Sequence, residues 1–314
     1  MNRKLFHLAL FISLPLLSFS QFHWDIGGTL GASNYLGDIG GKDQTRRDFV
    51  ADLKFSQTHI AGSIFARYKV SQNFSMRSAF TYGRISGNDA LSTNPGRAGR
   101  NLSFRNDLLE LSATGEFCFL RIMDVGHGYR YTNDFKAYVF GGVAGLYSNP
   151  KAEYMGKWYA LQPLRTENVA YNRFQLALPA GAGFYYTIDK QQRIGWELGW
   201  RTTFTDYLDD ISTVYADPSG MSQIGSKLAN RNDELQPYTA GSDLPAPQNY
   251  DPGSKRGDPT HNDSYMFSSV NYSYVIKGHS KQWHSWNHDH PRYHNIVFSD
   301  KWGGKYHRTH RIKL

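Results

Sequence analysis

The sequence predicts an all-β protein: an eight-stranded antiparallel transmembrane β-barrel with long extracellular loops and a C-terminal periplasmic tail. Three features predict it, namely an export signal, segments of alternating apolar and polar residues, and a regular alternation of shorter and longer connections. The 314 residues contain 15% aromatics and one cysteine, Cys118, so a disulfide framework is excluded. After Leu17 no run of about 18 apolar residues occurs, which excludes helical membrane spans.

Residues 1–20 have the pattern of a cleavable signal peptide. Arg3-Lys4 supplies the positive charge, Leu5–Leu17 the apolar stretch, and Ser18-Phe19-Ser20 the small-residue cleavage site. An apolar run of about a dozen residues is too short to anchor the chain in a bilayer. We therefore expect an exported chain that begins at Gln21. Export argues against nucleic-acid partners, although the net charge is +8.

Eight segments of the mature chain, within residues 21–275, alternate with a period of two. In the seventh, Trp196, Leu198 and Trp200 share one face, and Glu197 and Arg201 lie on the other. The predicted strands are Trp24–Tyr35, His59–Val70, Phe74–Ile85, Asn106–Phe119, Phe135–Tyr147, Leu176–Tyr186, Ile194–Phe204 and Ser264–Val275.

The connections between these strands alternate in length. Ser71–Asn73 and Lys190–Gln192 are short, and Leu120–Asp134 is intermediate. The other connections are long, as expected of an outer-membrane barrel with brief periplasmic turns and extended external loops. An even number of strands places both termini in the periplasm. The long connections are 36–58, 86–105, 148–173 and 208–263.

Charged residues fall on the strand faces opposite the bulky apolar ones. A soluble sandwich or lipocalin-like barrel also alternates, but its interior would have to accept Trp196, Trp200, Phe184, Phe117 and Phe119 together. A membrane barrel instead turns those residues to lipid and pairs the charges in its lumen. The predicted lumen charge network is Asp25, Arg67, Arg77, Glu110, Glu116, Glu197 and Arg201.

The sequence offers little support for catalysis or a cofactor. Glu110 and Glu116 are paired carboxylates, but inside a filled barrel they are expected to be structural. His59 and Ser63 share a strand face, yet four residues of strand span about 13 Å, so they cannot touch. We expect no enzymatic activity, no cofactor and a lumen closed to ions.

The segment 276–314 is basic and rich in His and Trp. It holds eight Lys or Arg against two acidic residues, whereas 208–263 holds four against nine. Four histidines, His284, His288, His290 and His294, have spacing that partly fits zinc, but Pro291 would break a helix there. Metal binding is therefore not predicted. Two alternatives remain, a solvated tail and a tail that docks on anionic lipid or a partner protein. The predicted partner-binding residues are Trp283, Trp286, Arg292, Trp302, Arg308 and Arg311.

Three stretches together resemble the PorG family. They are Tyr35-Leu36-Gly37-Asp38, the segment Tyr138–Ala152, and the segment Gly195–Ser212. The most specific part is Thr205-Asp206-Tyr207-Leu208-Asp209-Asp210. These acidic residues are expected at the external rim, where they would cap a turn or bind a cation weakly.

The resemblance implies a non-enzymatic barrel of the type IX protein secretion system, located in the outer membrane. It implies association with the periplasmic ring of PorK and PorN and with other secretion components, and a part in gliding motility where gliding occurs. An adhesion or structural barrel like OmpA or OmpX, without a secretion role, is the alternative that the residues leave open.

Overall fold

The computed structural model describes residues 23–39, 55–92, 94–125, 132–188, 191–235 and 249–277. His23–Ile276 form one compact unit. The predicted signal peptide and residues 278–314 of the predicted tail lie outside the described residues. Those two assignments stay predictions.

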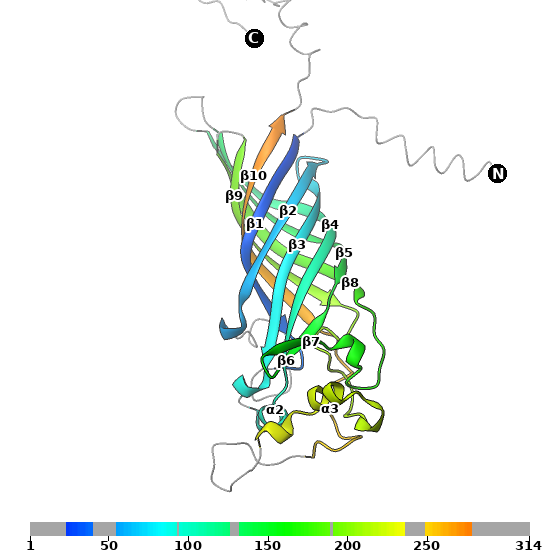
Figure 1. Ribbon diagram of the computed structural model, residues 1–314. Coiled ribbons are helices and arrows are strands. Elements are labelled where there is room, and N and C mark those ends of the chain that lie inside the picture. Colours follow the sequence, from blue (N-terminus) through cyan, green and yellow to red (C-terminus); the bar gives the residue numbers. More distant parts are fainter. Residues whose placement is uncertain are drawn as a thin grey trace, which may run out of the picture. The chain divides into compact units, whose positions relative to one another are not determined.

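The centre of the fold is a closed antiparallel barrel of eight strands (Figure 1). Neighbouring strands follow the order β3-β2-β1-β10-β9-β8-β5-β4, and pairing between β3 and β4 closes the circle. The predicted fold class is confirmed. The barrel strands are β1 (His23–Leu36), β2 (His59–Lys69), β3 (Phe74–Asn88), β4 (Ser103–Val125), β5 (Thr132–Tyr147), β8 (Phe174–Ile188), β9 (Gln192–Thr203) and β10 (Ser264–Lys277).

The two ends of the barrel differ in their connections. At the turn end, β2 and β3 are joined by the predicted turn, in which Phe74 N donates to Ser71 Oγ at 3.0 Å. The predicted intermediate link Leu120–Asp134 is wrong, because β4 and β5 continue pairing as far as Val125 and Thr132. A register shift between Cys118 and Leu120 lets the strand continue past a change in its alternation.

The long loops at the other end carry their own secondary structure. A hairpin of β6 (Pro150–Tyr154) and β7 (Lys157–Ala160) extends the sheet from β4. Two helices, α2 (Pro95–Arg100) and α3 (Gln223–Ala229), are capped by the side chains of Asn94 and Ser222. Short 3₁₀ helices are η3 (Phe55–Gln57), η4 (Asp89–Leu91), η5 (Gln162–Leu164), η6 (Pro218–Gly220) and η7 (Asn232–Leu235).

None of the helices in the described ranges is long and apolar enough to cross a membrane.

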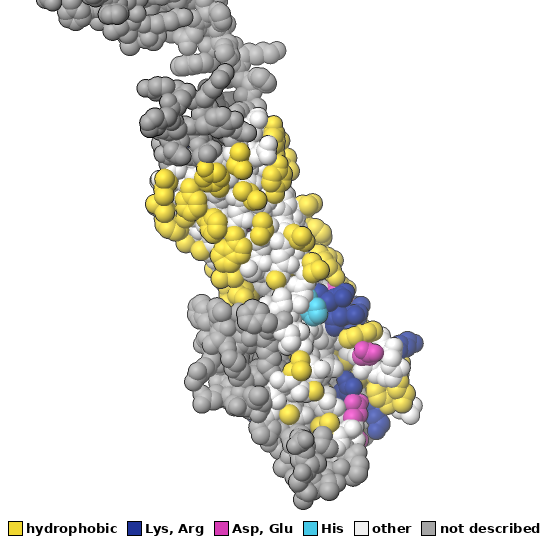
Figure 2. Space-filling view, turned by 90° about the vertical axis from the view of Figure 1, so that its left-hand side faces the viewer, with side chains coloured by type: hydrophobic (Ala, Val, Ile, Leu, Met, Phe, Trp, Pro, Cys, Tyr) yellow, Lys and Arg dark blue, Asp and Glu magenta, His cyan; other side chains and the backbone are white. Residues whose placement is uncertain are grey.

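The barrel is apolar outside and charged inside. Outward side chains such as Leu30, Ile60 and Leu176 are 69%, 74% and 64% exposed, whereas Asp25 and Glu110 are 1% and 0% exposed. Figure 2 shows hydrophobic side chains spread over the barrel wall, with the visible Lys, Arg, Asp and Glu gathered toward the loop end. This polarity is the reverse of a soluble barrel and fits hydrocarbon around the strands.

The interior has two zones. At the loop end, inward residues of the strands such as Ile85, Leu108 and Phe267 form one apolar core with loop residues such as Leu208 and Leu228. Toward the turn end the interior is charged and aromatic, with a small cluster of Tyr138, Phe140 and Tyr185. We call the first zone, with its loops, the loop dome, and the second the lumen network.

Candidate functional site

The lumen network is a chain of ion pairs across the barrel. Arg67 Nη1 lies 2.7 Å from Asp25 Oδ2, and Arg67 Nε lies 2.7 Å from Glu116 Oε2. Arg77 continues the chain, with Nε 3.2 Å from Glu116 Oε1 and Nη1 2.5 Å from Glu197 Oε2. Each of these side chains is less than 10% exposed. The strand register thus alternates cations and anions around the lumen.

Aromatic rings fill the space around these charges. The guanidinium of Arg67 lies 5.7 Å from the ring centre of Tyr138 and 5.0 Å from that of Tyr185. The Tyr138 hydroxyl donates to Glu197 Oε2 at 2.8 Å. Opposite Tyr138 the wall carries Gly183, where a Cβ would stand 2.8 Å from that hydroxyl. The glycine makes room for the ring.

A second pair lies nearer the loop end. Arg201 Nε is 3.4 Å from Glu110 Oε2, and the Tyr265 hydroxyl donates to the same oxygen at 2.7 Å. The guanidinium of Arg201 also lies 4.5 Å from the ring centre of Phe267. The structure therefore brings all seven residues of the predicted lumen set into the interior, in two groups.

Sequence reasoning missed several members of the network. Arg193 Nη1 contacts Asp25 Oδ2 at 2.5 Å, and Lys136 Nζ lies 3.2 Å from Asp134 Oδ2. The period-two alternation was a usable signal, because Arg193 is four residues before Glu197 on the same strand face. The tyrosine hydroxyls gave no such signal, because tyrosine suits either face.

The segment Thr205–Asp210 holds the loop dome together. Asp263 N donates to Thr205 O at 2.9 Å, and Leu208, fully buried, accepts from Asn106 Nδ2 at 2.7 Å through its carbonyl. Leu208 N in turn donates to Asp263 Oδ2 at 2.9 Å. The segment thus connects the end of β9 to the start of β10 and to β4.

Two carboxyls of the dome share one tyrosine hydroxyl. Tyr35 Oη lies 2.6 Å from Asp209 Oδ2 and 2.7 Å from Asp263 Oδ1. Burial, followed by the charges of nearby carboxylates, raises the pKa of both aspartates well above the ordinary value. Since the hydroxyl has one proton to donate, the second contact needs a proton on a carboxyl. This cluster therefore holds a proton when the dome is folded.

The other aspartates of the segment are also buried rather than displayed at the rim. Burial first, and then the neighbouring Asp209, raises the pKa of Asp206 to about 8. Burial raises the pKa of Asp210 to about 6, and its side chain accepts from Thr166 at 2.5 Å and Tyr171 at 2.6 Å. The described residues contain no group of three or more His, Cys, Asp or Glu that could hold a metal ion.

Tyr207 is half-buried and stacks on Tyr171, with ring centres 4.8 Å apart. The hydroxyl of Tyr207 lies 3.4 Å from Glu167 Oε2. Glu167 also accepts from Arg256 Nη1 at 2.9 Å, in a buried ion pair. A second buried pair, Arg100 with Asp89, lies in the same dome at 2.7 Å.

The residues considered for hydrolysis are arranged differently from a catalytic pair. Ser63 contacts Thr29 at 2.7 Å, and His59 Nε2 lies 2.6 Å from Ser86 Oγ instead. Ser86 donates its own proton to Gln57, so it accepts from the imidazole. A nucleophilic serine needs the opposite direction of proton donation. The predicted partner-binding residues Trp283, Trp286, Arg292, Trp302, Arg308 and Arg311 lie outside the described residues.

A closed eight-stranded barrel with an apolar wall and a charged lumen has the fold of an outer-membrane β-barrel. Residues 3–232 match the family described as "Domain of unknown function (DUF6089)", and the chain belongs to that family. None of the curated proteins compared with the sequence matches it.

Several solved outer-membrane proteins are similar in structure. Ail, the attachment invasion locus protein of Yersinia pestis, is 9% identical, with 82% of this chain and 100% of that chain covered and a TM-score of 0.37. OprG from Pseudomonas aeruginosa is 8% identical, the match covers 82% of this chain and 96% of OprG, and the TM-score is 0.35. Neisserial surface protein A is 7% identical, with 80% and 95% covered and a TM-score of 0.31.

Proposed function

We propose that this protein is a non-enzymatic outer-membrane component of the type IX protein secretion machinery, which anchors the periplasmic PorK–PorN ring at the membrane. The observation that supports the non-conducting part of this proposal is the filled interior. The lumen network and the loop dome occupy the two halves of the barrel with buried side chains. A barrel filled in this way offers no passage for cargo through its lumen.

The assignment to secretion and gliding rests on the resemblance of the Thr205–Asp210 segment and its neighbours to the PorG family. In this protein the segment organises the loop dome through buried contacts. A motif with that role keeps the extracellular loops in a fixed arrangement. We therefore assign partner binding to the periplasmic side. The proposed topology, with both termini in the periplasm, places the short turns and the basic segment 278–314 on that side.

The test is co-purification from native membranes in mild detergent. We expect PorK and PorN to co-purify with the full chain and not with a chain truncated after Lys277, where β10 ends. Both chains should give the same heat-dependent shift of the folded band on gels, because all eight strands are retained. Retention of the ring by the truncated chain would show that 278–314 is not the docking segment.

The second candidate is an adhesion or structural barrel like OmpA or OmpX. The observation that favours it is the loop dome, because an external end with its own apolar core and buried ion pairs is an ordered binding surface. Planar-bilayer recording tests the closed lumen that both candidates share. Loss of surface adhesion with secretion intact, in a chain whose dome is disrupted, would favour the adhesion role.

A further inference from the structure

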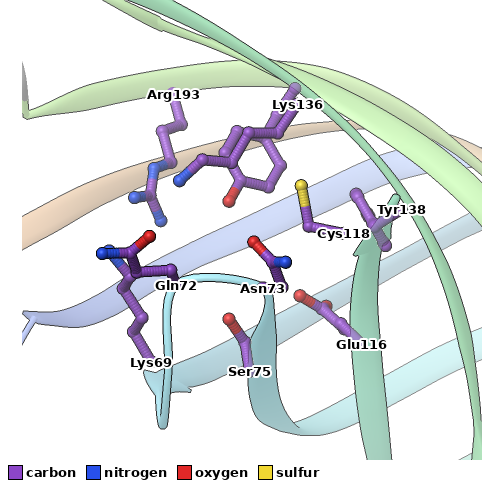
Figure 3. Close-up of a pocket in the computed structure, with 10 residues that line it drawn as sticks. Lys69, Gln72, Asn73, Ser75, Glu116, Cys118, Lys136, Tyr138 and Arg193 are labelled. Carbon is purple, nitrogen blue, oxygen red and sulfur yellow. The ribbon is translucent and has the colours of Figure 1, made fainter. Parts of the chain in front are cut away.

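The mouth of the barrel at the turn end is lined by cations that converge from different strands. Lys69 of β2, Lys136 of β5 and Arg193 of β9 reach toward one space (Figure 3). Gln72 and Asn73 of the β2–β3 turn lie on the same space and offer amide groups. The enclosed part of this space is small, about 10 Å³, which is room for about one water, so an anion would bind at the mouth and not deep in the lumen.

Among the described residues that line this mouth, positive charge exceeds negative charge. The one carboxylate in that described lining is Glu116, which already contacts two arginines of the lumen network. Arg193 and Lys136 each contact one carboxylate, at 2.5 and 3.2 Å. Among the described residues no carboxylate lies within ion-pair distance of Lys69. An anion entering the mouth therefore meets three cations that the described carboxylates only partly neutralise.

Burial makes this charge effective. Lys136 and Arg193 are 4% and 9% exposed, and the buried rings of Tyr138 and Tyr185 line the space beside them. Charges below the rim of a protein cavity are screened less by water than charges on a flat surface, so they attract an anion more strongly. The exposed Gln72 and Asn73 leave the mouth accessible at its edge.

We propose that this mouth binds a carboxylate side chain of an acidic peptide segment presented by a periplasmic protein. That the partner is periplasmic rests on the proposed function. That the ligand is an anion rests only on the residues that line the mouth. A peptide fits better than a lipid because the lining side chains face the lumen, while bilayer lipids contact the outward faces. The segment 276–314 is an unsuitable occupant because it carries eight basic and two acidic residues.

The single cysteine supplies a reporter inside this site. Cys118 lines the same space and is partly exposed, so its alkylation rate reports access to the mouth. In the full mature chain in neutral detergent, we expect capped hexaglutamate to slow alkylation by iodoacetamide in a saturable way. The rate should fall roughly tenfold when the peptide is at ten times its Kd, by mass action. Capped hexaglutamine is the uncharged control.

Two variants make the same charge change at opposite ends of the molecule. Lys69→Glu should weaken the Kd for hexaglutamate at least about fivefold, the effect of reversing one partly exposed charge. Lys227→Glu, on α3 and 52% exposed, should leave it unchanged. The proposal would be overturned if hexaglutamate did not slow the alkylation of Cys118, or if it slowed alkylation equally in the two variants. So would protection by phosphatidylglycerol nanodiscs but not by hexaglutamate, because it would identify a lipid site.

The ring experiment separates this inference from the proposed function. If Lys69→Glu abolishes hexaglutamate protection while the wild-type chain never co-purifies with PorK and PorN, the anion site stands and the secretion role fails. If PorK and PorN co-purify with the wild-type chain while hexaglutamate does not protect its Cys118, the secretion role stands and this inference fails.

Discussion

The lumen network and the loop dome close the two halves of one barrel by different physical means. In the lumen network, carboxylates face arginines at fixed strand positions, and Glu116 lies between Arg67 and Arg77. In the loop dome, carboxyls from the two ends of the long β9–β10 loop face one another across Tyr35, and apolar residues surround them. Balanced charge can be buried as ions, whereas an excess of carboxyls can be buried only with protons.

This difference predicts which part of the structure each kind of substitution destabilises. Removing or reversing a charge in the lumen network leaves a buried ion without a partner and should destabilise the whole barrel, because the strands themselves carry the charges. Changes in the loop dome should release loops while the barrel remains closed. Urea unfolding of the barrel and proteolysis of the loops distinguish these two outcomes.

The largest effect is expected for Arg201→Glu. The side chain is buried beside Glu110, and reversal would set two carboxylates together in the interior. We expect a loss of about 3–5 kcal/mol or more in the free energy of unfolding, measured by urea titration of the heat-modifiable band. The double variant with Glu110→Arg should recover part of it. Arg84→Glu is the matched control, because this arginine is 36% exposed and pairs with Asp107, and its effect should stay below that of Arg201→Glu.

A smaller effect is expected for Tyr138→Phe. The change removes the hydroxyl that donates to Glu197 and leaves the ring in its place beside the Arg67 guanidinium. A buried acceptor that loses one hydrogen bond costs about 1–3 kcal/mol. The same urea titration should show this loss with a single transition. A loss as large as that of Arg201→Glu would mean that the hydroxyl, rather than the ion pairs, holds the network together.

The sequence predicted the lumen better than the dome for a physical reason. Strand alternation fixes which face a residue occupies, so Arg67, Glu116 and Glu197 could be assigned to the interior from the period alone. Their partners depend on register, which the pattern does not give. The β4–β5 extension was missed because the shift at Cys118 breaks the period.

The dome could not be predicted from local pattern because its contacts join residues far apart in the chain. Tyr35 and Asp209 are separated by 174 positions, and Tyr35 and Asp263 by 228. Acidic residues in loops also suggest an exposed rim on composition alone. The resemblance pointed to the segment Thr205–Asp210, but its role as a buried connector is visible only in the folded structure.

Gly37→Ala should open the dome without unfolding the barrel. A Cβ at this position would stand 1.9 Å from the Tyr35 hydroxyl and 2.1 Å from Asp263 Oδ1. We expect the loops to be cleaved faster by protease while the urea midpoint of the barrel changes little. Gly220→Ala is the matched control, because nothing lies within 4 Å of a Cβ there. Unfolding of the whole barrel by Gly37→Ala would show that the two zones are not separable.

The dome also responds to pH, and the sign of the response follows from its carboxyls. The pKa of Asp210 is raised to about 6 and that of Asp206 to about 8, and those of Asp209 and Asp263 lie well above the ordinary value. A carboxyl whose pKa is raised on folding contributes stability at low pH that is lost as pH rises through the folded pKa. The dome should therefore loosen progressively as pH rises from about 4 through 8. The other ionisable groups that face this cluster are Tyr35, Asp38, Arg100, Glu167, Tyr171 and Arg256.

Hydrogen exchange of the loop amides at pH 5, 7 and 9, corrected for intrinsic rates, measures this loosening. Protection of the 205–213 segment should fall with pH, while protection of β8 and β9 amides near Glu197 should not, because the ions there are already paired. Asp206→Asn should remove the part of the change near pH 8, since the amide stays neutral throughout. Asp217→Asn, exposed in the same loop, should leave the profile unchanged. Protection that rises with pH would contradict the protonated cluster and would mean that the dome carboxyls are ionised in the folded protein.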